Sequence, residues 1–367
     1  QHHGIKPRGH AEQVPHGSVV LEPVERRFLR RTAAQEILRR YYSYACEYAL
    51  GLVEKDTVER AELIMKGLGL KKTDRIVATH AHAAAAAGHR HGASGGAGAV
   101  IGIEWAGEIA ALGGAVPAES GLTVGDRVMC SGAGGYAEYA ATDWGRVYKL
   151  SNASVDFVQA ATLPIALQTA HEAITASGGF QRGEVVLVQG ASSSVGLMSL
   201  QVARLLGASL VIGTSTRPER QDKLKAFGAD TVVDTRDEHW PQQVLDATGG
   251  QGADLVVDFV AGATMNRNMQ ATRICGRIVN VGRMGGFTGE FDFDLHSLRR
   301  IRYIGVTFRT RTREEVRDIA RHMRHDLWHA VTDGSIRLPV HKTFALEDAP
   351  DALACMRTNA HFGKIVL

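Results

Sequence analysis

The chain has 367 residues, of which 44% are hydrophobic and 22% charged, and this composition excludes a collagen-like, coiled-coil or globally disordered polymer. Lysine and arginine number 42 against 39 for aspartate and glutamate, so the net charge of +3 gives no general attraction to nucleic acid or to a membrane surface. No segment approaches the roughly 18 apolar residues of a membrane-spanning helix, and residues 1–16 lack the apolar core of a signal peptide. We therefore expect a small-molecule partner, with no nucleic acid and no membrane, and a cytoplasmic location.

Residues 1–99 form an atypical segment that is partly of low complexity. Arginines crowd residues 26–40, where interleaved glutamates favour a solvated helix face over a nucleic-acid surface, and residues 57–65 have the pattern of a short amphipathic helix. Residues 81–99 are almost entirely alanine, glycine and histidine. The spacing of the histidines in and beside this tract is compatible with a metal, but biased composition explains it more simply. They are His80, His82, His89 and His91.

Short strands predict a small β domain from residue 100 onward. A turn at Gly125 and Asp126 leads into a strand at 127–129, and alternating residues at 136–141 predict an antiparallel strand. The four cysteines lie far apart and form no CxxC pair, so each is interpreted as a free, buried thiol. They are Cys46, Cys130, Cys275 and Cys355.

Strands and helices alternate from about residue 154. Helical periodicity at 157–176 precedes an apolar strand at 185–189 and a helix at 195–206. Further strands are predicted at 210–213, 231–233, 255–259 and 277–281, and further helices at 219–227, 242–248 and 265–272. Such alternation requires crossover connections and predicts an α/β fold with a doubly wound parallel sheet, beside the smaller β domain.

The chain beyond this alternation carries two more candidate strands. They lie at 290–294 and 302–308, at the far end of the parallel sheet, where an uncovered edge would expose unpaired backbone groups. A helix at 313–333 and a strand at 364–367 close the chain. Pairing of the exposed edge with its twin across a two-fold axis predicts a homodimer, and protection of that edge by its own arginines is the alternative.

A glycine-rich turn joins the strand at 185–189 to the following helix. Gly190 opens the turn, and Gly196 stands where the helix must pack closely on the strand. These are the requirements of a dinucleotide site, although the middle glycine of a strict GxGxxG pattern is missing and a plain βα turn is the alternative. The candidate cofactor-binding residues are Gly190, Ser192, Ser193, Ser194, Val195 and Gly196.

The residues that follow the predicted strand at 210–213 favour a cofactor whose ribose carries a phosphate. Thr216, Arg217 and Arg220 supply a hydroxyl and two guanidinium groups about 24 residues after Gly190, where an NAD site commonly places a carboxylate. These residues predict NADPH as the cofactor. The alternative is that the arginines only decorate a solvated helix start, and Glu219 is a charge of the opposite sign among them.

At this point the chain resembles the zinc-independent quinone oxidoreductase branch of the medium-chain dehydrogenase/reductase superfamily. The residues that carry the resemblance are 183–187 with Gly190, Gly196, Gln201 and Arg204, and the motifs at 102–108, 125–128, 134–139, 163–164, 169–170 and 363–367. The resemblance covers residues 100–367. Before that, neither the opening strand nor the asparagine-containing nicotinamide loop of the family is found.

The resemblance implies a barrel-like catalytic domain formed by residues 100–152 and 307–367, with residues 1–99 as a further part of it. It implies a Rossmann domain at 153–306 whose cofactor is NADPH. The residues carried over as its lining are Thr169, Ser192 to Gly196, Thr216, Arg220, Val281 and Gly282. Ile103 stands where zinc-dependent relatives place a ligand histidine, so no metal is expected. Related reductases often dimerise through the sheet edge, which agrees with the homodimer expected above.

The function expected from these features is NADPH-dependent transfer of hydride to a quinone or to the β-carbon of an activated alkene. Tyr136 and His171 are candidate proton donors by residue type alone, and the alternatives are a core tyrosine, a satisfied histidine and a proton from solvent. Two rival functions stay open. One is a trans-acting enoyl reductase of a biosynthetic pathway, and the other is a non-catalytic NADPH-binding interaction protein.

Overall fold

The computed structural model describes residues 18–22, 78–79, 100–150 and 155–367. The helices predicted at 26–40 and 57–65, the histidine-rich tract and Cys46 lie outside the described residues.

A six-stranded parallel sheet forms one half of the described structure. Its strands lie in the order β12-β11-β10-β7-β8-β9, and all the pairings are parallel. The bounds are β7 Val185–Gln189, β8 Leu210–Thr214, β9 Thr231–Val233, β10 Ala253–Asp258, β11 Thr272–Asn280 and β12 Arg302–Gly305. The chain runs outward in one direction from β7 to β9 and in the other from β10 to β12, which confirms the doubly wound sheet predicted from the alternation.

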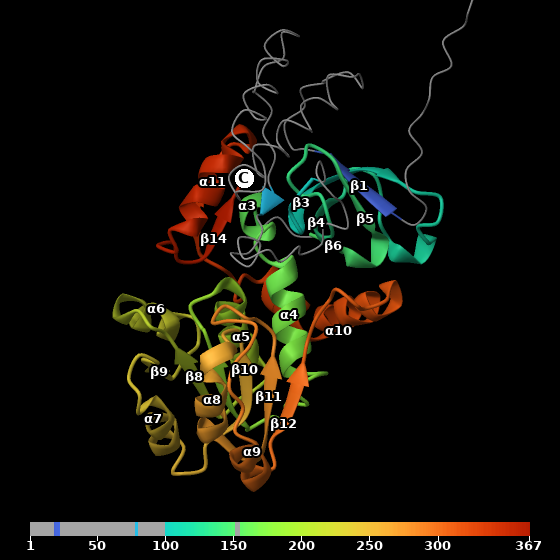
Figure 1. Ribbon diagram of the computed structural model, residues 1–367. Helices are drawn as coiled ribbons and strands as arrows, with labels where there is room; N and C mark the ends of the chain where they lie inside the picture. The colour runs from blue at the N-terminus through green and yellow to red at the C-terminus, as the bar shows by residue number, and fades with distance from the viewer. Residues whose placement is uncertain (1–17, 23–77, 80–99, 151–154) are drawn as a thin grey trace, which may run out of the picture.

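Helices cover both faces of this sheet (Figure 1), and its central strand β7 accordingly carries buried apolar side chains on both faces. Val186 and Val188 of β7 join one core cluster, whereas Leu187 between them joins another with Trp240. The helices beside this sheet are α4 Pro164–Ile174, α5 Ser194–Leu205, α6 Gln221–Ala226, α7 Trp240–Ala247, α8 Met265–Ala271 and α9 Phe293–Arg299, whereas α3 Phe157–Ala160 lies beside β3 of the other sheet (Figure 1). The predicted helix at 157–176 is divided into α3 and α4, because Pro164 starts a new helix.

The strand predicted at 290–294 is wrong, and the strand predicted at 136–141 is only partly right. Residues 290–294 form no strand, since Asp292 accepts a hydrogen bond from the amide of Leu295 at 2.9 Å and caps α9. The strand predicted at 136–141 begins only at Ala140, where β5 Ala140–Asp143 starts. The residues before it fold back instead, and the amide of Tyr136 donates to the carbonyl of Ile101 at 2.8 Å.

A sheet of eight strands forms the second half of the described structure, and it is antiparallel except for the parallel pair β13 and β14. Its main path is β13-β14-β2-β3-β1-β5, and β4 pairs with β3 and β6. The further bounds are β1 Ser18–Glu22, β2 Ala78–Thr79, β3 Glu104–Leu112, β4 Arg127–Ser131, β6 Val147–Lys149, β13 Val340–Thr343 and β14 Lys364–Val366. Strand β1 is a correction to the sequence analysis, which found no opening strand before residue 100. The five residues carry little pattern of their own, and their strand is defined by pairing with β3 and β5.

The last part of the chain links the two sheets. Helix α10, Arg313–Thr332, packs its buried face into the core cluster that also contains α4, while α11, Ala349–Arg357, packs on the antiparallel sheet. In Figure 1 the carboxyl ends of the parallel strands point toward the antiparallel sheet. The nucleotide-binding residues predicted from the sequence follow these carboxyl ends.

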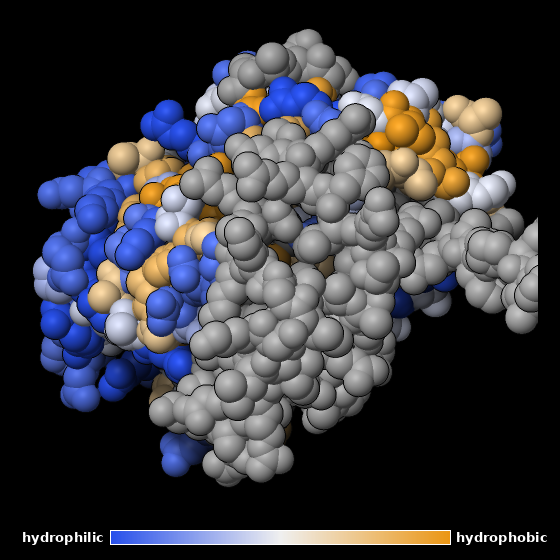
Figure 2. All heavy atoms as spheres, turned by 90° about the horizontal axis from the view of Figure 1, so that it is seen from above, coloured by the Kyte–Doolittle hydropathy of each residue, from blue (hydrophilic) through white to orange (hydrophobic). Residues whose placement is uncertain are grey.

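The described surface is mixed in character. Seen from above in Figure 2, hydrophilic residues predominate on the left, and a hydrophobic patch lies on the opposite side. Within the described residues, no helix is both long enough and apolar enough to cross a membrane.

The cysteines differ from the expectation that each is buried. Cys130 is buried, Cys355 is half-buried and Cys275 is exposed, and all three are free thiols. Cys275 also has a φ of +61° and lies where the pairing of β11 with β10 shifts register, between Thr272 and Arg277.

Candidate functional site

The glycine turn after β7 is held by the end of the neighbouring strand. Gly190 has a φ of +79°, its amide donates to Oγ1 of Thr214 at 2.9 Å, and the amide of Ala191 donates to the carbonyl of Thr214 at 3.1 Å. A Cβ atom at position 190 would lie 3.1 Å from side-chain atoms of both Val260 and Met284. The loops after β7, β10 and β11 therefore meet at Gly190, where a side chain would fill the space between them.

Ser193 starts helix α5. Its Oγ accepts a hydrogen bond from the amide of Gly196 at 3.1 Å and donates to the carbonyl of Gly190 at 2.9 Å. The serine that replaces a usual glycine of the family thus caps the helix and closes the turn. Ser194 and Val195 are the first residues of α5, where backbone amides have no partner within the helix and can bind phosphate oxygens.

Gly196 has no room for a side chain. Its Cβ would lie 2.6 Å from the carbonyl oxygen of Gly190 and 2.7 Å from Cα of Ala191. Both atoms belong to the backbone, so no side chain can move aside. The sequence analysis expected Gly196 to let the helix pack closely on the strand and turn. The structure shows this close approach.

The end of β8 places its three candidate residues in different environments. Thr216 is exposed, and the side chain of Arg217 is 37% exposed with only a 3.7 Å contact to Glu219. Arg220 is 7% exposed, and its guanidinium donates to the carbonyls of Asn359 at 3.1 Å and His361 at 2.8 Å. The side chains of Thr216 and Arg217 are thus accessible to a ligand, whereas the guanidinium N–H groups of Arg220 are bonded to the backbone of residues 359 and 361.

Arg220 still touches the glycine turn. Its Nη1 lies 3.4 Å from Oγ of Ser192, and burial together with the nearby Arg217 lowers the pKa of Arg220. The residue therefore joins the turn to residues 359–361, which come from the far end of the chain.

A buried carboxylate organises the loop after β10. Asp258 is fully buried, and its Oδ1 accepts hydrogen bonds from the amides of Val260 at 2.8 Å and Ala261 at 3.0 Å. Burial raises the pKa of Asp258, and the two backbone donors oppose that rise. The bonds hold Ala261 at a φ of +57°, which a residue with a side chain rarely adopts.

The Val281–Gly282 loop is hydrogen-bonded to the backbone of Asp258. The amides of Val281 and Gly282 donate to the carbonyl of Asp258 at 2.8 and 3.1 Å. A Cβ at Gly282 would lie 2.6 Å from the carbonyl oxygen of Phe259. Sequence reasoning missed Asp258 and Thr214, although a polar residue at the carboxyl end of an apolar strand was the signal available in both cases.

The two candidate proton donors are packed in the interior. His171 is 2% exposed, and its Nε2 lies 2.7 Å from Oδ2 of Asp326, which joins α4 to α10. Burial lowers the pKa of His171, and the bond to Asp326 opposes this. Tyr136 is 3% exposed in the core cluster of the antiparallel sheet that also contains Trp105.

Thr169 lies half-buried on α4, one helical turn before Glu172. The remaining candidates, residues 190–196, Thr216, Arg217, Val281 and Gly282, surround the carboxyl ends of β7, β8 and β11. The crevice between β7 and β10 is the topological switch point of the sheet, the usual ligand position of doubly wound folds. Fold and site together define a dinucleotide-binding α/β protein with an added antiparallel domain.

Two family matches agree with this division. The family described as "Alcohol dehydrogenase GroES-like domain" matches residues 63–152, and the one described as "Zinc-binding dehydrogenase" matches residues 194–324. The first match reaches back to residue 63, so the family resemblance is not confined to residues 100–367 as the sequence analysis held.

Individual relatives fall into two groups. The chain is 34% identical to the quinone oxidoreductase of Pongo abelii over 221 residues, which cover 60% of this chain and 65% of that protein. It is 28% identical to a phenolphthiocerol/phthiocerol polyketide synthase of Mycobacterium tuberculosis over 273 residues, 74% of this chain and 12% of the synthase polypeptide. The chain thus spans about two thirds of the first relative and about an eighth of the second.

Among solved structures, a mycobacterial protein complexed with NADPH superposes with a TM-score of 0.70 at 24% identity. The superposition covers 80% of this chain and 89% of the other, and it shows a shared fold. The chain is a quinone oxidoreductase-like member of the medium-chain dehydrogenase/reductase superfamily.

Proposed function

We propose that the protein is a zinc-independent, NADPH-dependent oxidoreductase that reduces a quinone or the carbon–carbon double bond of an enone or enoyl group. The observation that carries the proposal is the glycine turn at the switch point, with its serine-capped helix and with Arg217 exposed at the end of the next strand. The quinone oxidoreductase relative supports the reaction class.

The residues present fit a dinucleotide. Gly190 and Gly282 leave space that a Cβ would take, and α5 presents its amino end to the same crevice. In the proposal the turn at 190–196 binds the pyrophosphate, Thr216 and Arg217 bind the 2′-phosphate, and Thr169 with the Val281–Gly282 loop lines the remainder. The bound nicotinamide supplies the hydride.

The chain itself contributes orientation and shielding. The loops fixed by Asp258 and Thr214 hold the walls of the crevice in one arrangement, so little ordering is needed when a ligand binds. His171 and Tyr136 are packed in the interior, and solvent supplies the proton in the proposed reaction.

A trans-acting enoyl reductase is the second candidate. The polyketide synthase relative aligns with 74% of this chain, more of it than the quinone oxidoreductase does, and this favours a carrier-linked enoyl substrate. A protein that binds NADPH without turnover is the third. All three candidates share the nucleotide site. The two enzymes differ in the acceptor that they reduce, and the third candidate reduces none.

One screen separates the three candidates. NADPH and NADH oxidation are followed with quinones, free enones and enoyl groups attached to a carrier, in each case with the purified chain. Reduction of quinones or free enones supports the leading proposal, and turnover restricted to carrier-linked groups supports the second. Binding without turnover of any acceptor refutes both enzymes.

Replacement of Arg217 by alanine is expected to weaken NADPH binding by about 1 to 3 kcal/mol and to leave NADH binding unchanged, since a charge-assisted contact to the 2′-phosphate is lost. Calorimetric dissociation constants at two salt concentrations measure this. Arg321→Ala, an exposed arginine of α10 paired with Asp318, is the matched control and should change neither affinity. Equal affinity of the unaltered protein for NADPH and NADH would contradict the assignment.

Arg220→Ala should weaken both cofactors together, because Arg220 positions the turn through Ser192 and the C-terminal segment. This differs from the sequence expectation that Arg220 is itself a selective phosphate ligand. A loss confined to NADPH would restore that expectation.

Activity is expected to survive exhaustive chelation. Ile103 places an apolar, buried side chain where zinc-dependent relatives have a ligand, and elemental analysis of active, untagged protein should find less than stoichiometric zinc. One zinc per chain that is lost together with turnover would overturn the zinc-free proposal.

We also propose a homodimer through the edge strand β12. Exposed apolar side chains gather beside that strand: Phe293 is 76% exposed and Tyr303 is 45% exposed, and both rings pack in a tilted arrangement against Phe291. Phe293→Asp is expected to weaken the dimer at least ten-fold, whereas Val124→Asp, at a 63% exposed residue of the other domain, should have no effect. Light scattering over a range of concentrations measures both. A mass that stays at 39.5 kDa for the unaltered protein refutes the dimer.

A further inference from the structure

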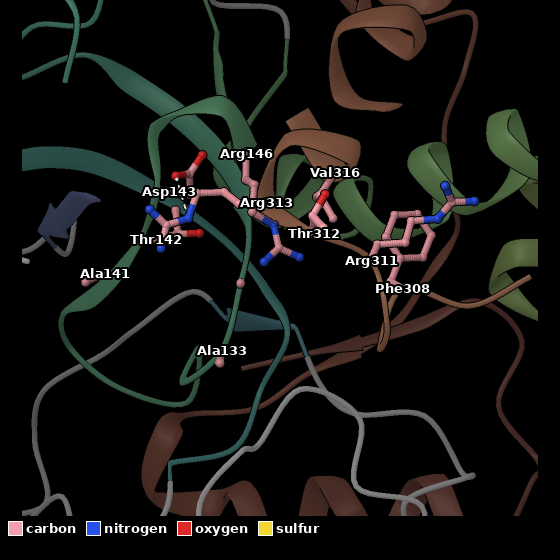
Figure 3. Close-up of a pocket in the computed structure, with 11 residues that line it drawn as sticks. Ala133, Ala141, Thr142, Asp143, Arg146, Phe308, Arg311, Thr312, Arg313 and Val316 are labelled. Carbon is pink, nitrogen blue, oxygen red and sulfur yellow. Dashed lines mark ion pairs between the residues drawn. The ribbon is translucent and has the colours of Figure 1, made fainter. Parts of the chain in front are cut away.

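A cavity of about 330 Å³ lies where the segment after β12 meets the antiparallel sheet (Figure 3). Three arginines line it: Arg146, Arg311 and Arg313. In Figure 3, Arg146 and Arg313 lie between Asp143 on one side and Arg311 with Phe308 on the other. The volume is within the range of small-ligand pockets.

Arg146 is the unusual member of this group. It ends the short 3-10 helix Trp144–Arg146, and its Nε is buried without a hydrogen-bond partner. Within the described residues Arg146 forms no hydrogen bond or ion pair, and burial lowers its pKa. Arg146 as a whole is half-buried, and its guanidinium stays charged in proteins, but an N–H group that is buried without a partner, as Nε is, costs stability. The cost indicates a role that folding alone does not explain.

The acidic groups around the cavity are already engaged. Asp143 accepts two hydrogen bonds from Arg317, both at 2.7 Å, and lies 3.6 Å from Arg313. Glu172 binds Arg311 at 2.5 Å, and Glu315 is the reciprocal partner in the capping box of Thr312. Among the described residues, no acidic side chain forms an ion pair with Arg146, and Asp143 attracts it only at longer range. The first turn of the 20-residue helix α10 adds a partial positive charge at Thr312.

We infer that this cavity is a binding site for an oxyanion, the carboxylate or phosphate group of a small molecule. Such a group would provide the paired oxygens that a guanidinium fork binds in a bidentate way, and it would neutralise Arg146. The Nε of Arg311 is likewise buried without a hydrogen-bond partner, so a second donor lines the same cavity.

The place of the cavity in the fold suggests that the oxyanion belongs to the acceptor of the proposed reaction. Phe308 follows the carboxyl end of β12 by three residues, and Arg311 is bound to Glu172, one turn along α4 from Thr169. The link between the cavity and the proposed site is therefore Glu172, which binds Arg311 and shares α4 with Thr169, and through this link the oxyanion site selects acceptors that carry an acidic substituent. This last step rests on the proposed function, whereas the oxyanion site itself does not.

Inorganic phosphate is the first probe. We expect it to raise the thermal unfolding midpoint of the cofactor-free protein in a saturable way, and to do so less at high salt. Arg146→Gln should lose that shift while its own midpoint, without phosphate, is no lower than that of the unaltered protein. Arg146→Lys, which keeps the charge but not the fork, should bind phosphate at least ten-fold more weakly, and the control Arg321→Gln should bind it normally. No shift in the unaltered protein, or an equal shift in Arg146→Gln, overturns the site.

Acceptor pairs that differ only by a carboxylate are the second probe. In the unaltered protein the carboxylated member should have the higher kcat/KM, and Arg146→Gln should reduce this ratio at least ten-fold. An unchanged ratio, together with a lost phosphate shift, refutes the acceptor assignment and leaves a site for a free anion. If no acceptor is reduced, the proposed function fails and the phosphate shift still decides whether the site exists.

Discussion

Replacement of Lys364 by alanine is expected to destabilise the protein by about 3 to 5 kcal/mol, because it leaves a buried carboxylate without its cationic partner. Lys364 of β14 and Glu104 of β3 form an ion pair in which the side chains are 4% and 1% exposed. Glu104 also accepts a hydrogen bond at 2.9 Å from the amide of Ile165 in the first turn of α4. The pair therefore holds together two strands of the antiparallel sheet and a helix of the parallel-sheet half. Urea unfolding at neutral pH measures the loss.

A double variant separates the cost of an orphaned charge from the value of the pair. Glu104→Gln with Lys364→Met removes both charges at similar volume, and it should recover most of the stability lost in Lys364→Ala. The control is the pair of Lys149 and Asp126, which are 2.8 Å apart with side chains 39% and 13% exposed, and Lys149→Ala should cost less than about 1 kcal/mol. A Lys364→Ala variant within 1 kcal/mol of the unaltered protein would show that the buried pair is not a structural link.

The parallel half of the fold was predictable because its signals are local. Each strand is a short apolar run, and each crossover helix follows within a few residues, so the order of elements determines the topology. The glycine turn belongs to the same class of signal, since strand, turn and helix are contiguous in the sequence. The strand at 18–22 is the opposite case, because its pairing partners in β3 and β5 lie more than 80 residues away.

The environment of individual site residues was less accessible to sequence reasoning. Arg217 and Arg220 are three residues apart and look equivalent in the sequence, yet only Arg220 meets the carbonyls of residues 359 and 361. Ser193 stands where the family usually has a glycine, and its hydroxyl caps α5, which the residue type alone did not indicate. In each case the decisive partner is set by backbone geometry, which residue type does not specify.

The arginine cavity illustrates the same limit at longer range. Arg146, Arg311 and Arg313 come from the antiparallel half and from the segment after β12, and no motif joins them. Only the docking of α10 between the sheets brings them to one cavity. The residues that hold this docking, His171 with Asp326 and Glu172 with Arg311, were visible in the sequence as isolated titratable groups.

Gly196→Ala is expected to have the largest effect on the nucleotide site. The added Cβ would stand 2.6 Å from the carbonyl oxygen of Gly190 and 2.7 Å from Cα of Ala191, and only a shift of α5 away from the turn can relieve this contact. That shift breaks the hydrogen bond from the amide of residue 196 to Oγ of Ser193, which is 3.1 Å long, and it moves the amides of the first turn. We expect a loss of about 1 to 3 kcal/mol in folding stability and a loss of dinucleotide binding of at least ten-fold for NADPH and NADH alike.

A second alanine substitution serves as the control for Gly196→Ala. Gly114 is exposed, and a Cβ there would have no neighbour within 4 Å, so Gly114→Ala should change neither the urea midpoint nor either dissociation constant. A Gly196→Ala variant that unfolds like the unaltered protein and binds both dinucleotides normally would show that the turn and α5 can separate freely. In that event the close approach of helix to turn would not be what positions the phosphate-binding amides, and the assignment of the pyrophosphate to residues 190–196 would fail. The added Cβ meets backbone atoms of the turn and does not touch the residues assigned to the 2′-phosphate. The effect on binding should therefore be the same for the two cofactors, in contrast to the selective loss expected of Arg217→Ala.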